Sequence, residues 1–310
     1  MFFFPYKADI LLNRIPLLTI LISILCLFIF GSQVSSDKKL LVNAETYCSK
    51  INNTNFYLSI EKITGGRSIE SCAGVLAGIH SAQGNIELIN RLAEAAEGFT
   101  RKGKEEGVNY IVSSLSDEYL KYSKSAPFSL TSELQYEPNS FDPVTMISSS
   151  FAHADIFHLL GNLVFFFAFA AAIEIVVGWI KYLLVTLFLS VGVSISYTMS
   201  ELSNVDALPT LGLSGVVMGM IGLFAYLMPT VRIRCILFFV FIFRTVVIPA
   251  WILAGVFVGW DIYQINFGDS NTGVNLVAHI SGAIIGFLFG VLFFKNEKKK
   301  AQESLSAIYN

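Results

Sequence analysis

The sequence predicts an all-α polytopic membrane protein, a bundle of six transmembrane helices with a small, mainly helical extracytoplasmic domain inserted into it. Of the 310 residues, 54% are hydrophobic and only 14% are charged, and the mean hydropathy is +0.62. Typical soluble domains carry about a quarter charged residues, so this composition excludes an ordinary soluble enzyme. Segment 32–142 holds 25 of the 44 charges, which marks it as the part outside the lipid bilayer. The net charge of −2 gives nucleic acid no electrostatic attraction as a partner.

Six apolar stretches are long enough to cross a bilayer, which takes roughly 20 residues of helix. Backbone amides in lipid must bond within their own segment, so each stretch should be helical. Arg244 interrupts the fifth, and we expect it to snorkel to the inner interface above an interfacial helix over Arg234–Phe243. The six are Ile15–Gly31, Ile156–Val177, Tyr182–Ser200, Leu208–Met228, the stretch around Arg244 that ends at Trp260, and Val274–Phe294.

Lysine and arginine in the short loops predict the orientation. They precede the first span at Lys7 and Arg14, follow the fourth at Arg232 and Arg234, and recur after the sixth. The short loops on the other side contain neither residue. Both termini are therefore predicted to be cytoplasmic.

The expected domains follow from this orientation. Residues 1–31 form the cytoplasmic N-terminus and first helix, 32–142 the extracytoplasmic inserted domain, 143–294 the membrane core, and 295–310 a basic cytoplasmic tail. An alternative makes 1–36 a cleaved signal peptide, although no clean Ala-x-Ala site follows it. The basic tail and the cysteines on the oxidising side favour a bacterial inner membrane, with a eukaryotic organelle as the alternative.

The inserted segment should contain a helical hairpin, because apolar residues recur at helical spacing on both sides of Gly103 and Gly107. Cys48 and Cys72 fall on the oxidising side, where they could form a disulfide or remain two free thiols. His80 has no plausible fellow ligand nearby, and we expect it on the surface.

Four polar residues stand out within the spans: His158 and Asn162 in the second, Ser214 in the fourth and His279 in the sixth. Polar groups are expensive to bury in lipid and are functional candidates by default. Asn162, Ser214 and His279 each lie five or six residues from the outer end of their span, roughly 8–9 Å deep. Their common depth predicts one shared site.

Glycine stripes indicate which helices touch. The sixth span carries Gly282, Gly286 and Gly290, and the fourth carries a stripe that starts at Gly215. Such stripes let two helix backbones approach closely. Because Ser214 adjoins one stripe and His279 the other, the hydroxyl and the imidazole should come within reach of each other.

This pairing predicts an activated serine nucleophile. A hydroxyl is a weak nucleophile until a base takes its proton, and a histidine suits that task near neutral pH. The side-chain N–H groups of Asn162 and His158 could bind an oxyanion. Asp155, Glu174 and Asp261 lie near span ends, so we expect none of them to orient the histidine, and the site should be a dyad.

Three motifs in three spans resemble those of the rhomboid family of intramembrane serine proteases. They are the H-x4-H-x3-N pattern of His153, His158 and Asn162, the G-x-S-G pattern of Gly212, Ser214 and Gly215, and the A-H-x-x-G-x-x-x-G pattern of Ala278, His279, Gly282 and Gly286. The resemblance covers the first span and residues 142–294. It implies a rhomboid-like bundle.

The resemblance also implies residue roles. Ser214 would be the nucleophile and His279 the general base. Asn162, His158 and the backbone N–H of Ser214 would bind the oxyanion, and His153 would be a structural hydrogen-bonding residue at the mouth of the site. The family cleaves membrane-embedded protein substrates within a transmembrane segment, near the outer surface, and uses no metal or cofactor.

The sequence departs from the family pattern at two places. Position 218 usually holds an aromatic residue that stacks on the catalytic histidine, and here it is Met218, whose thioether can still pack against an imidazole. The Trp-Arg pair that usually follows the first span is absent between residues 32 and 150. We therefore expect an altered histidine orientation and an altered substrate gate.

Three alternatives accompany this interpretation. A catalytically silent rhomboid-like protein would bind membrane clients, but such proteins usually lack the serine or the histidine. A transporter would show internal repeats and charges at mid-bilayer. A metal site of His153, His158 and His279 is disfavoured, because the first two lie about 140° apart around their helix. The oligomeric state is not predicted.

Overall fold

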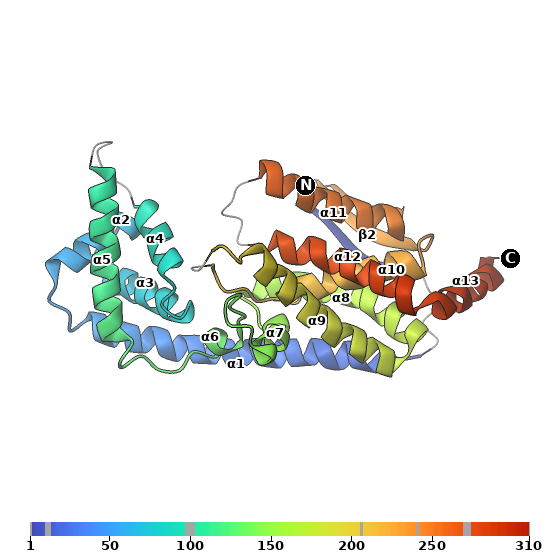
Figure 1. Cartoon of the computed structure of the whole chain (residues 1–310), viewed down its shortest axis with the longest axis horizontal. Coiled ribbons are helices and arrows are strands. Elements are labelled where there is room, and N and C mark those ends of the chain that lie inside the picture. The colour runs from blue at the N-terminus through green and yellow to red at the C-terminus, as the bar shows by residue number, and fades with distance from the viewer. Residues whose placement is uncertain are drawn as a thin grey trace.

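The computed structural model describes residues 2–9, 14–96, 103–204, 207–239, 242–268 and 274–309. One long helix, α1 (Leu17–Cys48), runs along the molecule and connects two groups of helices (Figure 1). The smaller group lies on one side of the C-terminal end of α1, and the larger group lies along the rest of it, mainly through α8. The larger group contains α8 (Ile156–Val177), α9 (Trp179–Ser200), α10 (Ser214–Leu227), α11 (Ala250–Phe267) and α12 (Leu276–Phe293).

Among the described residues, four helices are long and apolar enough to cross a membrane: α1, α8, α9 and α12. Helix α10 has 14 residues, about 21 Å, and every one from Gly215 to Leu227 is buried. Because its neighbours shield it, the segment before it can be non-helical without exposing polar backbone to lipid. Helices α10 and α11 occupy the predicted fourth and fifth spans, and the count of six spans stays a prediction.

The prediction of an all-α fold is wrong in one place, where a small antiparallel sheet joins the N-terminus to the segment after α10. Its strands are β1 (Phe2–Ala8), β2 (Arg232–Phe239) and β3 (Ile242–Pro249), in that order across the sheet. Strands β2 and β3 pair through register partners such as Cys235 and Val246. They stand where an interfacial helix was expected.

The sequence of β2 explains this difference. Ile233 and Cys235 are buried, whereas Arg232 and Arg234 between and beside them are exposed, which is the period-two alternation of a strand. An average of hydropathy over a long window does not register this alternation. Arg244 is exposed on β3, outside any helix, so it does not interrupt a spanning helix as expected.

Helix α1 begins at a carboxylate supplied by another helix. Glu174 of α8 accepts hydrogen bonds from the backbone N–H groups of Leu18 at 2.9 Å and Thr19 at 2.8 Å, and from the Thr19 hydroxyl. The buried carboxylate satisfies N–H groups that a helix start leaves unpaired, and it complements the positive end of the helix dipole. The helix continues to Cys48, well beyond the end predicted at Gly31.

The smaller group has a hydrophobic core of its own, separate from that of the larger group. Leu40 of α1 contributes to it, together with Phe56, Leu76 and Leu115. The helices of the smaller group are α2 (Thr54–Thr64), α3 (Ile69–Ser81), α4 (Ile86–Glu94) and α5 (Lys104–Tyr122). A disulfide joins Cys48 of α1 to Cys72 of α3.

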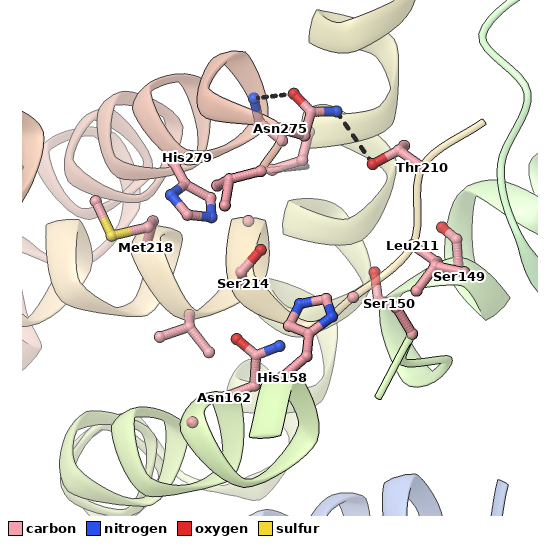
Figure 2. Close-up of a pocket in the computed structure, with 18 of the residues that line it drawn as sticks. Ser149, Ser150, His158, Asn162, Thr210, Leu211, Ser214, Met218, Asn275 and His279 are labelled. Carbon is pink, nitrogen blue, oxygen red and sulfur yellow. Dashed lines mark hydrogen bonds between the residues drawn. The ribbon is translucent and has the colours of Figure 1, made fainter. Parts of the chain in front are cut away.

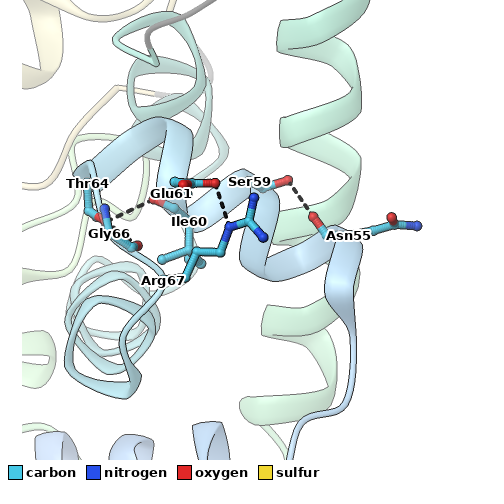
Figure 3. Close-up of polar contacts among 7 residues, drawn as sticks. All are labelled: Asn55, Ser59, Ile60, Glu61, Thr64, Gly66 and Arg67. Atoms are coloured by element: carbon cyan, nitrogen blue, oxygen red, sulfur yellow. Dashed lines mark hydrogen bonds and ion pairs between the residues drawn. The ribbon is translucent and has the colours of Figure 1, made fainter.

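Helices α4 and α5 pack together where the hairpin was predicted, but α2 and α3 were not expected, and Gly107 lies inside α5. The turn between α2 and α3 is held by polar contacts, including that of Arg67 with Glu61 (Figure 3). His80, expected at the surface, lies partly beneath it. Its ring is half-buried, with Nε2 at 3.2 Å from the carbonyl oxygen of Pro127.

Short elements complete the described chain. Between the two groups lie α6 (Leu130–Leu134), α7 (Pro143–Ser148) and a single 3-10 turn, η1 (Ser149–Phe151), and α13 (Lys295–Tyr309) follows α12. The placement of residues 32–142 outside the membrane stays a prediction, as do the four domain boundaries.

Candidate active site

Helices α10 and α12 pack with their backbones in contact. A Cβ atom on Gly282 would overlap the carbonyl oxygen of Gly215, and one on Gly286 would overlap that of Gly219. Only glycine permits this approach, because any side chain at these positions would push the helices apart. The contact fixes the spacing of the helix ends that carry the serine and the histidine.

A pocket of about 800 Å³ opens where α8, α9, α10, α11 and α12 meet. In Figure 2, Ser214 lies between His279 of α12 and Asn162 of α8, and His158 lies beside Asn162. The structure thus gathers the four polar residues that stood out within the predicted spans. Gly212, Gly215 and Met218 also line this pocket.

Ser214 is the first residue of α10 and is half-buried. No side chain caps this helix start, so its backbone N–H groups and the positive end of its dipole remain available to an anion. Gly212 precedes it with φ +122°, and a Cβ there would lie 2.7 Å from the His158 ring. Position 212 therefore requires glycine both for the backbone conformation and for the space that the imidazole occupies.

His279 contacts an acidic residue, so the expectation that no carboxylate reaches it is wrong. Its Nδ1 lies 3.2 Å from Oδ2 of Asp261 in α11. Helix α11 continues two turns past the predicted end of its span at Trp260. Asp261 therefore lies within the helix, beside the start of α12, and not at a solvent-exposed end.

Among the described residues, two buried nitrogen atoms in the pocket have no hydrogen-bond partner: Nδ2 of Asn162 and Nε2 of His279. Asn162 is only 8% exposed. A buried polar atom left unpaired costs about 1–3 kcal/mol, and such atoms in native proteins call for an explanation. A ligand that fills the pocket would pair both.

Comparison with known proteins places these observations in a family. A family model for the rhomboid domain matches residues 141–296, just over half of the chain. The chain belongs to the rhomboid family. The matched region of this rhomboid protein contains α7 to α12 and therefore the whole pocket, whereas α2 to α6 precede it.

The rhomboid chain is also similar to "Rhomboid protein 1, mitochondrial" of Saccharomyces cerevisiae, with 27% identity over 168 residues. The alignment covers 53% of this chain and 46% of the yeast protein, so the chain spans about half the length of that relative. Membership of this family, together with the apolar helices, identifies an integral membrane protein.

Two further residues of the rhomboid domain lie beside the polar side chains of the site. His153 is buried just before α8, with its ring edge-on to that of His158 at a centroid separation of 5.2 Å. Neither of its ring nitrogens has a hydrogen-bond partner among the described residues, so the hydrogen-bonding role that the resemblance implied for this side chain is not observed. Met218 lies one turn into α10 on the side of the pocket that His279 occupies (Figure 2). Gly282 and Gly286 lie in the contact between α10 and α12.

Sequence reasoning missed the contacts that hold the loop before Ser214. Thr210 and Tyr136 form a two-way backbone bridge, with N–H to carbonyl distances of 2.8 and 2.9 Å. Asn275 caps α12 and also donates from Nδ2 to the Thr210 hydroxyl at 3.2 Å. An asparagine just before an apolar helix is a recognisable cap, but nothing in the sequence indicated its second partner.

Proposed function

We propose that the protein is an intramembrane serine endopeptidase that cleaves transmembrane segments of other membrane proteins near the extracytoplasmic face. One observation carries the proposal: Ser214 lies at an uncapped helix start, between the unpaired Nε2 of His279 and the unpaired Nδ2 of Asn162. The first nitrogen suits a proton acceptor, and the second is a donor for developing negative charge.

The proposed reaction proceeds in two halves. The Ser214 oxygen attacks the carbonyl carbon of the scissile peptide bond while Nε2 of His279 takes the hydroxyl proton. The side chains of Asn162 and His158 and the backbone N–H of Ser214 donate hydrogen bonds to the resulting oxyanion. When the C–N bond breaks, the histidine gives its proton to the leaving amine, and an acyl-enzyme on Ser214 remains.

Water completes the cycle. The same histidine takes a proton from a water molecule, whose oxygen attacks the acyl carbon. Collapse of the second tetrahedral intermediate breaks the ester bond and returns the proton to Ser214. Serine and asparagine side chains make the pocket polar enough to hold that water inside a membrane protein.

The partners and the orientation are part of the proposal. Substrates are membrane-embedded proteins, and both termini of this chain face the cytoplasm. His279 is near the start of α12 and α13 follows its end, which puts the pocket and the basic tail at opposite ends of that helix. A bacterial inner membrane remains our prediction, although the yeast relative carries a mitochondrial name.

Cleavage by the full chain in liposomes tests the proposal. A reconstituted model substrate with one transmembrane segment should be cut by the wild type and left intact by Ser214→Ala and His279→Ala. Asn162→Ala should lower kcat by about 10²–10³-fold, as expected for loss of one oxyanion donor. Ser196→Ala is the matched control and should retain full activity, because the Ser196 hydroxyl donates to the carbonyl of Gly192 in its own helix.

Two outcomes would contradict the proposal. Cleavage by Ser214→Ala at the wild-type rate would show that another group is the nucleophile. A folded wild type that binds transmembrane substrates and never cuts them would favour the silent client-binding alternative.

A further inference from the structure

The Asp261 carboxylate contacts the histidine that acts as the general base in the proposed mechanism. Helices α11 and α12 pack side by side, and Oδ2 of Asp261 lies 3.2 Å from Nδ1 of His279. The two side chains are 10% and 16% exposed, so the contact is largely shielded from water. Asp261 also lines the pocket itself.

This contact decides which ring nitrogen holds the proton. An ionised carboxylate only accepts hydrogen bonds, so Nδ1 of His279 must carry the hydrogen that points to Asp261. In neutral imidazole the other nitrogen then has a free lone pair. That nitrogen is Nε2, the buried atom without a partner, and it is the atom that must take the proton of Ser214.

We propose that Asp261 is a positioning residue that holds His279 in the tautomer and ring orientation of a general base. The inference rests on the proposed function, because it acts through His279. When His279 takes the serine proton, the imidazolium lies beside a carboxylate, which stabilises the charge. The site is then a relay of Asp261, His279 and Ser214, where the sequence indicated two residues.

A purely structural tie between α11 and α12 would give the same distance, so the test needs a readout that depends on charge. The described titratable groups that line the pocket near His279 are Asp261 of α11, Asp155 and His158 at the start of α8, and Tyr197 of α9. Removing the Asp261 charge leaves the others in place. The pH dependence of kcat/KM therefore separates the two roles.

The experiment compares Asp261→Asn and Asp261→Glu in the liposome assay. Asp261→Asn should lower kcat roughly 10- to 100-fold, the loss expected for a hydrogen bond to a charged group, with KM changed by less than about twofold. The acid limb of kcat/KM should move to lower pH, because protonation of the imidazole loses its partner. Asp261→Glu should restore part of kcat and the position of the acid limb.

The controls keep the result interpretable. Asn266→Ala, on the same helix with its side chain bonded to Ile262 and exposed, should match the wild type in kcat and melting temperature. An Asp261→Asn protein with wild-type kcat and an unmoved acid limb overturns the inference. So does a kcat loss that Asp261→Glu fails to reduce while the acid limb stays in place, because a structural tie alone accounts for it.

Failure of the proposed function looks different. A wild type that does not cleave the substrate, or cleavage that persists in Ser214→Ala, overturns both statements. Dependence on Ser214 together with indifference to the Asp261 charge overturns only the positioning role.

Discussion

Gln33 in α1 accepts a hydrogen bond from the backbone N–H of His153 through its side-chain Oε1, at 3.1 Å. Its Nε2 donates to the hydroxyl of Thr131 at 3.0 Å, and the residue is 1% exposed. The side-chain amide of Gln33 thus connects α1 with α6 and with the residues just before α8. Since α8 carries His158 and Asn162, this contact holds the start of the helix on which the proposed oxyanion donors lie.

The stability of the protein should depend on pH through His153, which lies just before α8. Burial, aided by the neighbouring His158, lowers the pKa of His153 to about 4, from an ordinary value near 6.5. The unfolded chain therefore binds a proton in a pH range where the folded protein does not. Titration of His153 leaves the free energy of unfolding unchanged above about pH 6.5 and lowers it as the pH falls toward 4, by up to about 3 kcal/mol.

Melting temperatures in detergent at pH 7 and pH 4.5 check this prediction. Wild type should lose more stability on acidification than His153→Gln, which has no group to titrate there. His80 also has a pKa lowered by burial and contributes with the same sign, so only the difference between the two proteins counts. Equal losses in both proteins would refute the assignment to His153.

Replacing a contact glycine should separate α10 from α12. In Gly286→Ala the added methyl group meets the carbonyl of Gly219, and a backbone cannot move aside as a side chain can. We expect a loss of about 1–3 kcal/mol or more in unfolding free energy, together with lower activity. Thermal unfolding and cleavage measure the two effects.

Gly255→Ala is the matched control for this substitution. A Cβ at Gly255 in α11 meets nothing within 4 Å, and alanine favours a helix over glycine by about 1 kcal/mol. The control should be as stable as the wild type or slightly more so. A Gly286→Ala protein of unchanged stability would show that the helices are not in backbone contact.

Gly212→Ala should damage the site more than the fold. The substitution combines a strained backbone with a methyl group directed at the His158 ring. Gly178 also has a positive φ, 82°, but a methyl group there would meet open space, so Gly178→Ala isolates the cost of backbone strain alone. Both variants should lose roughly 1–3 kcal/mol of stability, but only Gly212→Ala should also lower kcat.

The parts of the site that follow from local pattern could be predicted from the sequence. The spacing of Gly282 and Gly286 and the common depth of Ser214, His279 and Asn162 follow from helix geometry. These residues do line one pocket or lie in one helix contact. What they do in catalysis is the proposal that the experiments address.

The missed features depend on partners far apart in the chain. Asp261 and His279 meet only because α11 extends past Trp260, and the end of a helix is poorly marked in apolar sequence. β1 pairs with β2, which lies more than 200 residues away, so neither strand could be placed from its own neighbourhood. A short strand of alternating residues also resembles part of a buried helix in overall hydropathy.

Labelling with a fluorophosphonate tests the central claim most directly, because it reports a nucleophilic serine without any substrate. Peptide mapping by mass spectrometry should find the phosphonyl group on Ser214 in the wild type. The label should be absent from Ser214→Ala and strongly reduced in His279→Ala, whose serine lacks its base. A wild-type protein that stays unlabelled at Ser214, or labelling that persists in Ser214→Ala, would contradict the account.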